Sequence, residues 1–415
     1  MTDEKISVQT DAMLETIEIA TADAKPESVE DAIIDVEQTL KEQTTTDDNG
    51  QKDDDYLLVV NDLKEYFPIS KSLIKSNTVY LKAVDGVSFK LREGKTIGIV
   101  GESGCGKTTL GRTILRLYEP TDGEIIFDGV HIEKLKGEAL RKLRPNFQMI
   151  FQDPYSSLSP RMTVGEIVGE AVKVHNIVPP EEYKDYVVDI MTKCGLQPHY
   201  FDRYPHEFSG GQRQRICIAK ALALKPKLVI CDEPVSALDV SIQAQIINLF
   251  KDLQESEHLS YIFISHDLSV VEHISDDVGV MYLGNMVEYG SKREMFDNPL
   301  HPYTKALFSA IPIPDPDTKI KRIVLEGDIP SPANPPAGCK FHTRCKQCMA
   351  ACKVLNPEFK DVGNGHFVAC HLYDQEVMSK PEYYEEMVRQ QEEAAAQALA
   401  EAEAKKPHWF KKKDK

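Results

Sequence analysis

Residues 101–108 are the first group whose types and spacing could do chemistry. They read GESGCGKT and fit the pattern G-x4-G-K-[ST], in which glycines let backbone N–H groups curl around an anion. The apolar run 96–100 (TIGIV) predicts a buried strand before them, and a helix is expected after them. This context predicts a phosphate-binding loop, in which Lys107 reaches the β- and γ-phosphates and Thr108 ligates Mg²⁺. Within the loop, Cys105 is either a redox switch or simply a small residue.

Two acidic residues, Asp232 and Glu233, follow a second predicted strand, the apolar run 228–231 (LVIC). An acid at such a strand end can hold the metal ion that the threonine of a phosphate loop also holds. We assign this role to Asp232, through a water molecule, and expect Glu233 to polarise the attacking water. The pair is a weak signal alone, and it gains weight from the phosphate loop about 125 residues earlier.

Residues 208–212 read FSGGQ, which resembles the LSGGQ signature of ABC ATPases with phenylalanine in the first position. Three further motifs occur in the order of that family: MIFQDP with the Q-loop glutamine Gln152, SALD with the D-loop Asp239, and ISHD with the switch histidine His266. Phe67, in EYFP, resembles the aromatic residue that stacks on adenine, with Tyr66 as the alternative.

The resemblance implies an α/β fold: an ABC-type nucleotide-binding domain with a P-loop ATPase core, an antiparallel β part and a helical subdomain. It further implies that two such domains meet head to tail, so that each ATP lies between one phosphate loop and the partner's signature. Glu233 and His266 would then be catalytic, and Thr108 and Gln152 would contact Mg²⁺. The implied ATP-binding residues are Phe67, Gly101, Glu102, Ser103, Gly104, Cys105, Gly106, Lys107, Thr108, Thr109, Gln152 and Asp232. The implied contacts to the partner's ATP are Ser209, Gly210, Gly211 and Gln212.

A closer resemblance covers the end of the chain. Residues 301–316 (HPYTKALFSAIPIPDP), 339–345 (CKFHTRC) and 368–371 (VACH) resemble the C-terminal region of oligopeptide/dipeptide importer ATPases, and the F subunit more than the D subunit. The likeness runs from about 56 to 373. It implies a motor for oligopeptide uptake at the cytoplasmic face of the plasma membrane. Dipeptides, nickel or another solute are alternative cargoes, and a soluble ABC ATPase or an inactive adaptor is the alternative function.

The same resemblance implies the partners. They are two transmembrane permease subunits, a second related ATPase subunit and, indirectly, an extracellular peptide-binding protein. Nucleic acid is not expected, because the net charge is −17 and residues 1–55 alone hold seventeen acidic residues against four lysines. No run reaches the roughly 18 apolar residues of a spanning helix, so we expect a soluble chain whose membrane role depends on a partner.

Five of the nine cysteines crowd into 339–370, which indicates a site. Cys339, Cys345, Cys352 and Cys370 resemble the spacing of an iron–sulfur cluster in this family, and four thiolates are the usual complement of a [4Fe–4S] cluster. Structural Zn²⁺ and no metal at all are the alternatives, since spacing alone does not choose the metal. Cys348 is an extra thiol in the same stretch.

Composition and the resemblance together divide the chain into four parts. They are an acidic disordered tail over 1–55, an ABC ATPase domain over 56–300 with a helical subdomain at about 160–205, a C-terminal region with the cysteine cluster over 301–373, and a charged helical tail over 374–415. Within the third part, the proline-rich stretch 301–337 predicts a linker or an extended segment.

Overall fold

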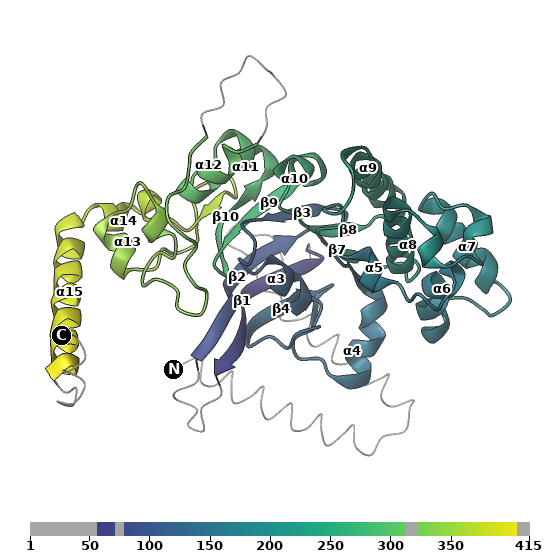
Figure 1. Ribbon diagram of the computed structural model, residues 1–415, viewed down its shortest axis with the longest axis horizontal. Coiled ribbons are helices and arrows are strands. Elements are labelled where there is room, and N and C mark those ends of the chain that lie inside the picture. Colours follow the sequence, from purple (N-terminus) through teal and green to yellow (C-terminus); the bar gives the residue numbers. More distant parts are fainter. Residues whose placement is uncertain (1–55, 71–78, 312–321, 405–415) are drawn as a thin grey trace, which may run out of the picture.

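The computed structural model describes residues 56–70, 79–311 and 322–404 of the 415-residue chain. The predicted acidic tail 1–55 and the end of the predicted charged tail, 405–415, lie outside the described residues. Figure 1 shows a central body of sheets, a lobe of helices at one end and a single long helix at the other.

The strands form two sheets. A four-stranded antiparallel sheet has the order β2-β1-β4-β5, and an eight-stranded mixed sheet has the order β11-β12-β10-β9-β3-β8-β7-β6. The strands are β1 (Leu58–Ser70), β2 (Val79–Leu91), β3 (Thr96–Val100), β4 (Asp122–Phe127), β5 (Val130–His131), β6 (Phe147–Ile150), β7 (Leu228–Asp232), β8 (Ser260–Ile264), β9 (Asp277–Tyr282), β10 (Asn285–Ser291), β11 (Lys360–Asp361) and β12 (Phe367–Val368).

Helices cover the eight-stranded sheet and extend from both of its ends (Figure 1). The segment for which a helical subdomain is expected holds α6 and α7, and the predicted charged tail holds α15. The described helices are α3 (Lys107–Ile114), α4 (Gly137–Leu143), α5 (Pro154–Ser157), α6 (Val164–Val174), α7 (Tyr183–Lys193), α8 (Gly210–Leu222), α9 (Val240–Glu257), α10 (Leu268–Ile274), α11 (Lys292–Asp297), α12 (Pro302–Phe308), α13 (Ala350–Val354), α14 (Gln375–Met378) and α15 (Pro381–Ala404).

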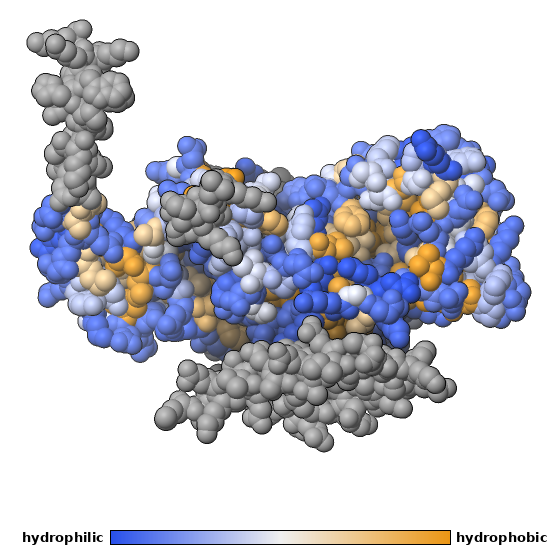
Figure 2. All heavy atoms as spheres, turned by 90° about the horizontal axis from the view of Figure 1, so that it is seen from below, coloured by the Kyte–Doolittle hydropathy of each residue, from blue (hydrophilic) through white to orange (hydrophobic). Residues whose placement is uncertain are grey.

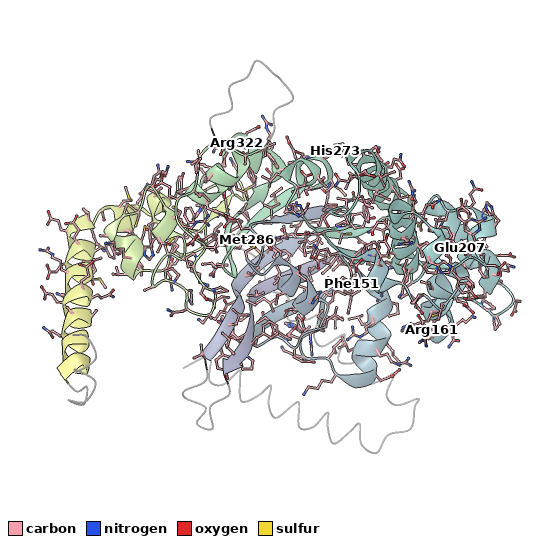
Figure 3. All side chains as sticks on the ribbon, in the orientation of Figure 1. Phe151, Arg161, Glu207, His273, Met286 and Arg322 are labelled. Atoms are coloured by element: carbon pink, nitrogen blue, oxygen red, sulfur yellow. The ribbon has the colours of Figure 1, made fainter. Side chains whose placement is uncertain are left out.

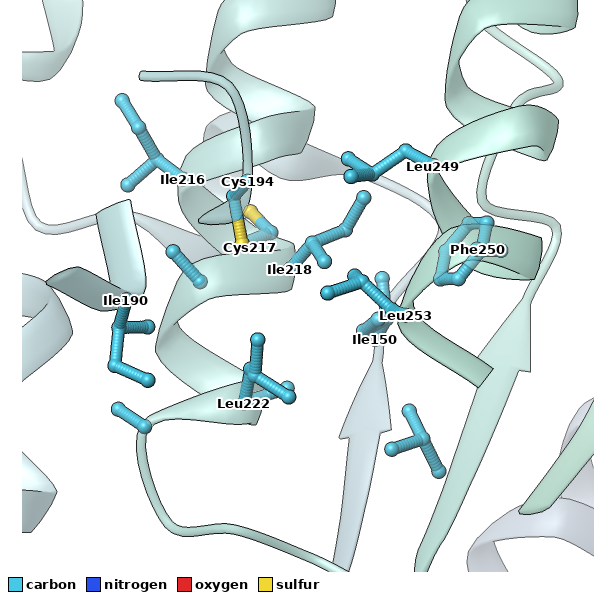
Figure 4. Packing of buried hydrophobic residues seen from close by; sticks show 14 of the residues in the cluster. Ile150, Ile190, Cys194, Ile216, Cys217, Ile218, Leu222, Leu249, Phe250 and Leu253 are labelled. Carbon is cyan, nitrogen blue, oxygen red and sulfur yellow. The ribbon is translucent and has the colours of Figure 1, made fainter. Parts of the chain in front are cut away.

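The strand β7 shows how the sequence sets the layers. All five of its residues are buried, as is typical of a parallel strand that is covered on both faces. Val229 and Cys231 pack with the helices α6 to α9, whereas Leu228 and Ile230 pack with α3 and the four-stranded sheet. Figure 4 shows the first of these clusters, where side chains of α8 and α9 face one another. The predicted α/β class is confirmed.

A sheet edge joins the C-terminal region to the ATPase domain. The short strand β12 pairs with β10, and places Val368 opposite Glu288. Glu288 is fully buried; its carboxylate accepts the backbone N–H groups of Leu300 at 2.7 Å and His301 at 2.8 Å, and lies 2.8 Å from Nε2 of His366. One buried carboxylate therefore ties together the two sides of the boundary that the sequence places at residue 300.

The prediction of a linker or extended segment over 301–337 is wrong for its first part. Residues Pro302–Phe308 form α12, whose N-cap is His301: its Nδ1 accepts the backbone N–H of Tyr303 at 3.1 Å. Pro302 stands in the first turn, where the missing N–H would have no helical partner. A proline in a stretch that was predicted to be a linker therefore stands at the start of a helix.

Candidate active site

A pocket of roughly 500 Å³ lies where the parallel strands end. Because β3, β6, β7 and β8 run parallel, the loops that follow them meet at one edge of the sheet. The predicted phosphate loop follows β3, and Gln152, Glu233 and His266 follow β6, β7 and β8. The pocket is lined by Leu81, Lys82, Ala83, Ser103, Gly104, Gly106, Lys107, Thr108, Thr109, Gln152, Glu233, His266, Gly284 and Pro332.

Gly106 shows why the loop needs glycine. Its φ of 107° lies in the left-handed region, and a Cβ there would collide with the carbonyl oxygen of Ala83. Gly106 is the N-cap of α3, and the first helical residues, Lys107, Thr108 and Thr109, line the pocket. The backbone N–H groups at the start of a helix suit an anion.

Two side chains of the loop make polar contacts that organise it. Lys107 is buried, and its Nζ donates to the carbonyl oxygens of Gly101 at 2.8 Å and Glu102 at 3.1 Å. Thr108 Oγ1 donates to Asp232 Oδ1 at 2.8 Å, so the two residues predicted to share Mg²⁺ lie side by side. Burial raises the pKa of Asp232 above its ordinary value, and the hydrogen bond from Thr108 offsets part of that rise. The paired oxygens are the kind of donors that Mg²⁺ prefers.

Glu233 is held from two sides. Gln152 Nε2 donates to its Oε2 at 2.8 Å, and His266 Nδ1 lies 3.3 Å from the same oxygen. Its backbone has a φ of +46°, an uncommon value for a residue with a side chain, and its N–H donates to the carbonyl of Ile264 at 2.9 Å. Figure 3 labels Phe151, the neighbour of Gln152, near α5, between the sheets and the lobe of helices. The predicted pair Glu233 and His266 thus stands together with the Q-loop glutamine.

Five of the predicted ATP-binding residues do not line the pocket: Phe67, Gly101, Glu102, Cys105 and Asp232. The ring of Phe67 packs edge-on against Tyr118, with centroids 5.3 Å apart. The alternative, Tyr66, donates its hydroxyl to the carboxylate of Asp85. Cys105 is buried, and burial raises the pKa of its thiol. The contact of Phe67 or Tyr66 with adenine therefore stays a prediction. The burial of Cys105 favours a small packing residue over an accessible redox switch.

The signature residues lie apart from this pocket. Ser209 is the N-cap of α8; its Oγ accepts the N–H of Gln212 at 3.4 Å, and Gln212 Oε1 accepts the N–H of Ser209 at 3.1 Å. Gly210 and Gly211 form the first turn of the helix. None of the four lines the pocket, and neither does the exposed Asp239. Their predicted role needs the ATP of another subunit.

The cysteine unit, residues 339–370, does not form a metal centre as it stands. Within the described ranges, no group of three or more His, Cys, Asp or Glu side chains could hold a metal ion, and all nine cysteines are free. Burial raises the pKa of Cys339 to about 12 and that of Cys370 to about 11, and neighbouring cysteines add to both shifts. Cys339 and Cys370 therefore lie near other cysteines, and both thiols favour the protonated form.

Sequence reasoning missed a set of residues from the C-terminal region. Arg344 and Tyr303 contact Glu102 of the phosphate loop, and Pro332 lines the pocket itself. Arg344 lies inside the CKFHTRC motif, but nothing local in that motif indicates contact with a loop 242 residues away. Contacts at such a separation depend on the packing of the folded chain.

Comparisons with known proteins agree with this geometry. The model of the ABC transporter family matches residues 84–236. A dimeric ATP-binding cassette, MJ0796, solved in a post-hydrolysis state with ADP and Pi, is 25% identical with a TM-score of 0.51; the match covers 57% of this chain and 99% of that one. CbiO1 from Clostridium perfringens is 28% identical with a TM-score of 0.52, over 59% of this chain and 92% of that one. The fold and the site define an ABC-type ATPase.

The C-terminal region and the curated relatives narrow this class. The model of the oligopeptide/dipeptide transporter C-terminal region matches residues 287–352. The oligopeptide transport ATP-binding proteins AppF of Bacillus subtilis and OppF of Haemophilus influenzae are 58% and 54% identical, each over 76% of this chain and 97% and 96% of their own lengths. The dipeptide transport ATP-binding protein DppF of Escherichia coli is 50% identical over 77% of this chain and 95% of its own length. The chain belongs to the oligopeptide/dipeptide family of ABC transporter ATP-binding subunits.

No helix in the described part of the chain combines the length and the apolarity that a membrane crossing requires. On the face drawn in Figure 2, hydrophobic residues form separate patches among hydrophilic ones.

Proposed function

We propose that this chain is the ATP-hydrolysing motor of an importer that takes up oligopeptides across the plasma membrane. The observation that carries the proposal is the pocket, where the phosphate loop, Gln152, Glu233 and His266 converge. The cargo rests on the C-terminal region and on relatives whose names specify oligopeptide transport. The dipeptide relative supports the alternative of a dipeptide cargo, and nickel or another solute is a further alternative.

The phosphate loop would bind the nucleotide. Lys107 would release the carbonyl oxygens that its Nζ now contacts and donate to the β- and γ-phosphates instead. Thr108 would ligate Mg²⁺ directly, and Asp232 would hold it through a water molecule. Gln152 would contact the same ion through its amide oxygen, and the Nε2 group that donates to Glu233 can stay in place. Bound Mg²⁺ would offset the charge that develops on the β- and γ-phosphate oxygens.

Glu233 would act as the general base. Its carboxylate can accept a proton from the attacking water while it accepts the hydrogen bond from Gln152, because a carboxylate has several lone pairs. His266, whose Nδ1 is 3.3 Å from that oxygen, would orient the carboxylate and hold the γ-phosphate. The strained backbone at Glu233 fits this role, because it fixes the side chain at the strand end.

The complete site would need a second subunit. Ser209, Gly210, Gly211 and Gln212 of one cassette would contact the ATP held by the phosphate loop of the other, and Asp239 would lie at the interface. We propose a related ATPase as that partner, with two transmembrane permease subunits and, indirectly, an extracellular peptide-binding protein. The chain would then sit peripherally on the cytoplasmic face of the membrane. We also propose an ATPase domain over residues 56–300 and a C-terminal region over 301–373, because the sequence motifs and the family resemblance indicate these limits.

An iron–sulfur cluster is the second cofactor considered, after Mg-ATP. Cys339, Cys345, Cys352 and Cys370 are the donors it would use, with Zn²⁺ as the alternative. Their present placement fits neither, because the described residues contain no group of three that could hold a metal. Iron, zinc and acid-labile sulfide, measured in anaerobically purified protein, would decide between cluster, zinc and no metal.

One experiment tests the transport function. The tagged chain is extracted from membranes in mild detergent, the proteins that copurify are identified, and the complex is reconstituted in vesicles with added peptides. We expect two polytopic proteins, a second ATPase, and ATP turnover that rises with oligopeptides delivered by the binding protein. Recovery without any membrane protein would contradict the importer, and stimulation by dipeptides or nickel alone would replace the cargo.

A further inference from the structure

The C-terminal region grips the phosphate loop through one ion pair. Arg344 Nη1 donates to Glu102 Oε2 at 2.7 Å and Nη2 donates to Oε1 at 3.1 Å. Two parallel contacts of this kind fix the planes of both groups, which a lysine could not do. The side chain of Arg344 is only 7% exposed and that of Glu102 is 26% exposed, so solvent screens the pair weakly. The pair raises the pKa of Arg344 further above its usual range.

The backbone of the same loop residue is held as well. The N–H of Glu102 donates to the hydroxyl of Tyr303 at 2.9 Å. Tyr303 is fully buried, and its ring lies 4.8 Å from that of Tyr282 and 5.4 Å from that of Phe341, measured between centroids. Tyr282 in turn lies beneath the guanidinium of Arg344, with the ring centroid 5.9 Å away. A rigid aromatic cluster therefore positions both groups that hold Glu102.

A second link joins the C-terminal region to the segment beside Gly284, which forms another part of the pocket wall. Lys340 Nζ donates to the carboxylate of Asp85 at 2.8 Å and to the carbonyl of Leu283 at 3.0 Å. The next residue, Gly284, lines the pocket, and its N–H donates to the carbonyl of Cys105 in the phosphate loop at 2.9 Å. The C-terminal region thus touches the loop directly and also through the segment beside it.

We propose that Arg344 is a positioning residue for ATP binding. Its pairing with Glu102 fixes the first turn of the phosphate loop and neutralises a carboxylate that would otherwise repel the phosphates of the nucleotide. Arg344 does not line the pocket, so it acts through Glu102 rather than on ATP. Loss of the guanidinium alone leaves a half-buried negative charge beside an anionic ligand, whereas loss of both charges removes that repulsion.

The test measures Mg-ATP binding by the purified full-length chain, as displacement of trinitrophenyl-ATP. We expect Arg344→Met to raise the Kd of ATP about tenfold, the size of one strong charge effect near a binding site. The double variant Glu102→Gln/Arg344→Met should return to within about threefold of wild type, because the two effects are coupled. Arg344→Lys keeps the charge but not the two parallel contacts. Its Kd should therefore lie between those of wild type and Arg344→Met.

Lys360→Met is the matched control. Lys360 pairs with Glu358 and Asp374 at 2.9 Å, and neither partner belongs to the ATPase domain, so Lys360→Met should leave the Kd unchanged. The unfolding midpoint of each variant is measured in parallel, and the lysine variant serves if Arg344→Met does not fold. An unchanged Kd in folded Arg344→Met, or an equal loss with and without the Glu102 carboxylate, would overturn the proposal. Because only ATP binding is measured, neither outcome depends on the cargo.

Discussion

The phosphate loop and the cysteine unit are organised to different degrees. In the first, Lys107 and Thr108 each have specific polar partners within about 3 Å. In the second, the thiols are free, and the described residues offer no group of three that could hold a metal. The cysteine unit nevertheless supplies Arg344, which contacts the loop.

The elements that carry the two regions explain the difference. The loop follows the fully buried strand β3. That strand is paired in parallel with β8 on one side and with β9 on the other. The cysteines lie on or between short elements, such as α13 with five residues and β12 with two. Side chains on rigid elements are placed accurately, whereas turns leave their side chains dependent on a bound group.

The largest effect is expected from Glu233→Gln in the assembled transporter. The amide keeps the size of the side chain but cannot accept the proton from water, so ATP turnover should fall by about 100-fold or more. Binding of Mg-ATP should stay within about threefold of wild type, because the base contributes to the reaction and little to binding. Equal turnover in the variant would contradict the assigned base, and a loss of binding would indicate a structural role instead.

Gly106→Ala tests the preorganised loop through its backbone. The new Cβ would meet the carbonyl of Ala83 at a positive φ, so we expect the free energy of unfolding to fall by about 3 kcal/mol. Gly104→Ala is the matched control: its φ is +77°, but its Cβ would meet nothing within 4 Å, and it should cost only about 1 kcal/mol. Urea unfolding of both variants measures the difference. Equal costs would show that the close approach to Ala83 is not a constraint.

The sequence was sufficient where a pattern is local. The buried strands before and after the loop, and the loop itself, follow from apolar runs and glycine spacing. The grouping of Gln152, Glu233 and His266 at one sheet edge could be expected only from the family resemblance, because each is a single residue. The pair Glu102–Arg344 spans 242 positions and has no local signal. The helix α12 was missed because a proline-rich composition predicts a linker, whereas the place of Pro302 in the first helical turn depends on the cap at His301.

His301 gives a smaller, pH-dependent effect on stability at the junction of the ATPase domain and the C-terminal region. Burial lowers its pKa to about 4; Lys305 also lowers it, and Glu288 partly opposes the shift. Below pH 6.5 the unfolded chain takes up a proton that the folded chain refuses, so stability falls as the pH drops from about 6.5 toward 4. Between pH 7.5 and 5.5, this site should cost about 1 kcal/mol.

His301→Asn removes the titrating ring but keeps an oxygen that can accept the N–H of Tyr303 at the start of α12. The variant should therefore lose about 1 kcal/mol less than wild type over the same pH range, as measured by urea unfolding at each pH. If both proteins lose stability in parallel, the pH dependence arises from other groups.

The smallest effect is expected from Cys348→Ser, which separates the extra thiol from the other four. Cys348 is exposed, and its Sγ donates weakly to the carbonyl of Met349 at 3.5 Å, so its loss should change stability by less than about 0.5 kcal/mol. Cys352 is buried, and a serine there should cost about 1–2 kcal/mol, because its hydroxyl would be buried in place of the thiol. Metal content measured on the same two variants sharpens the contrast. If a metal organises the cysteine unit, Cys352→Ser should lose it and Cys348→Ser should keep it; equal loss from both would make Cys348 a ligand and exclude the predicted set of four.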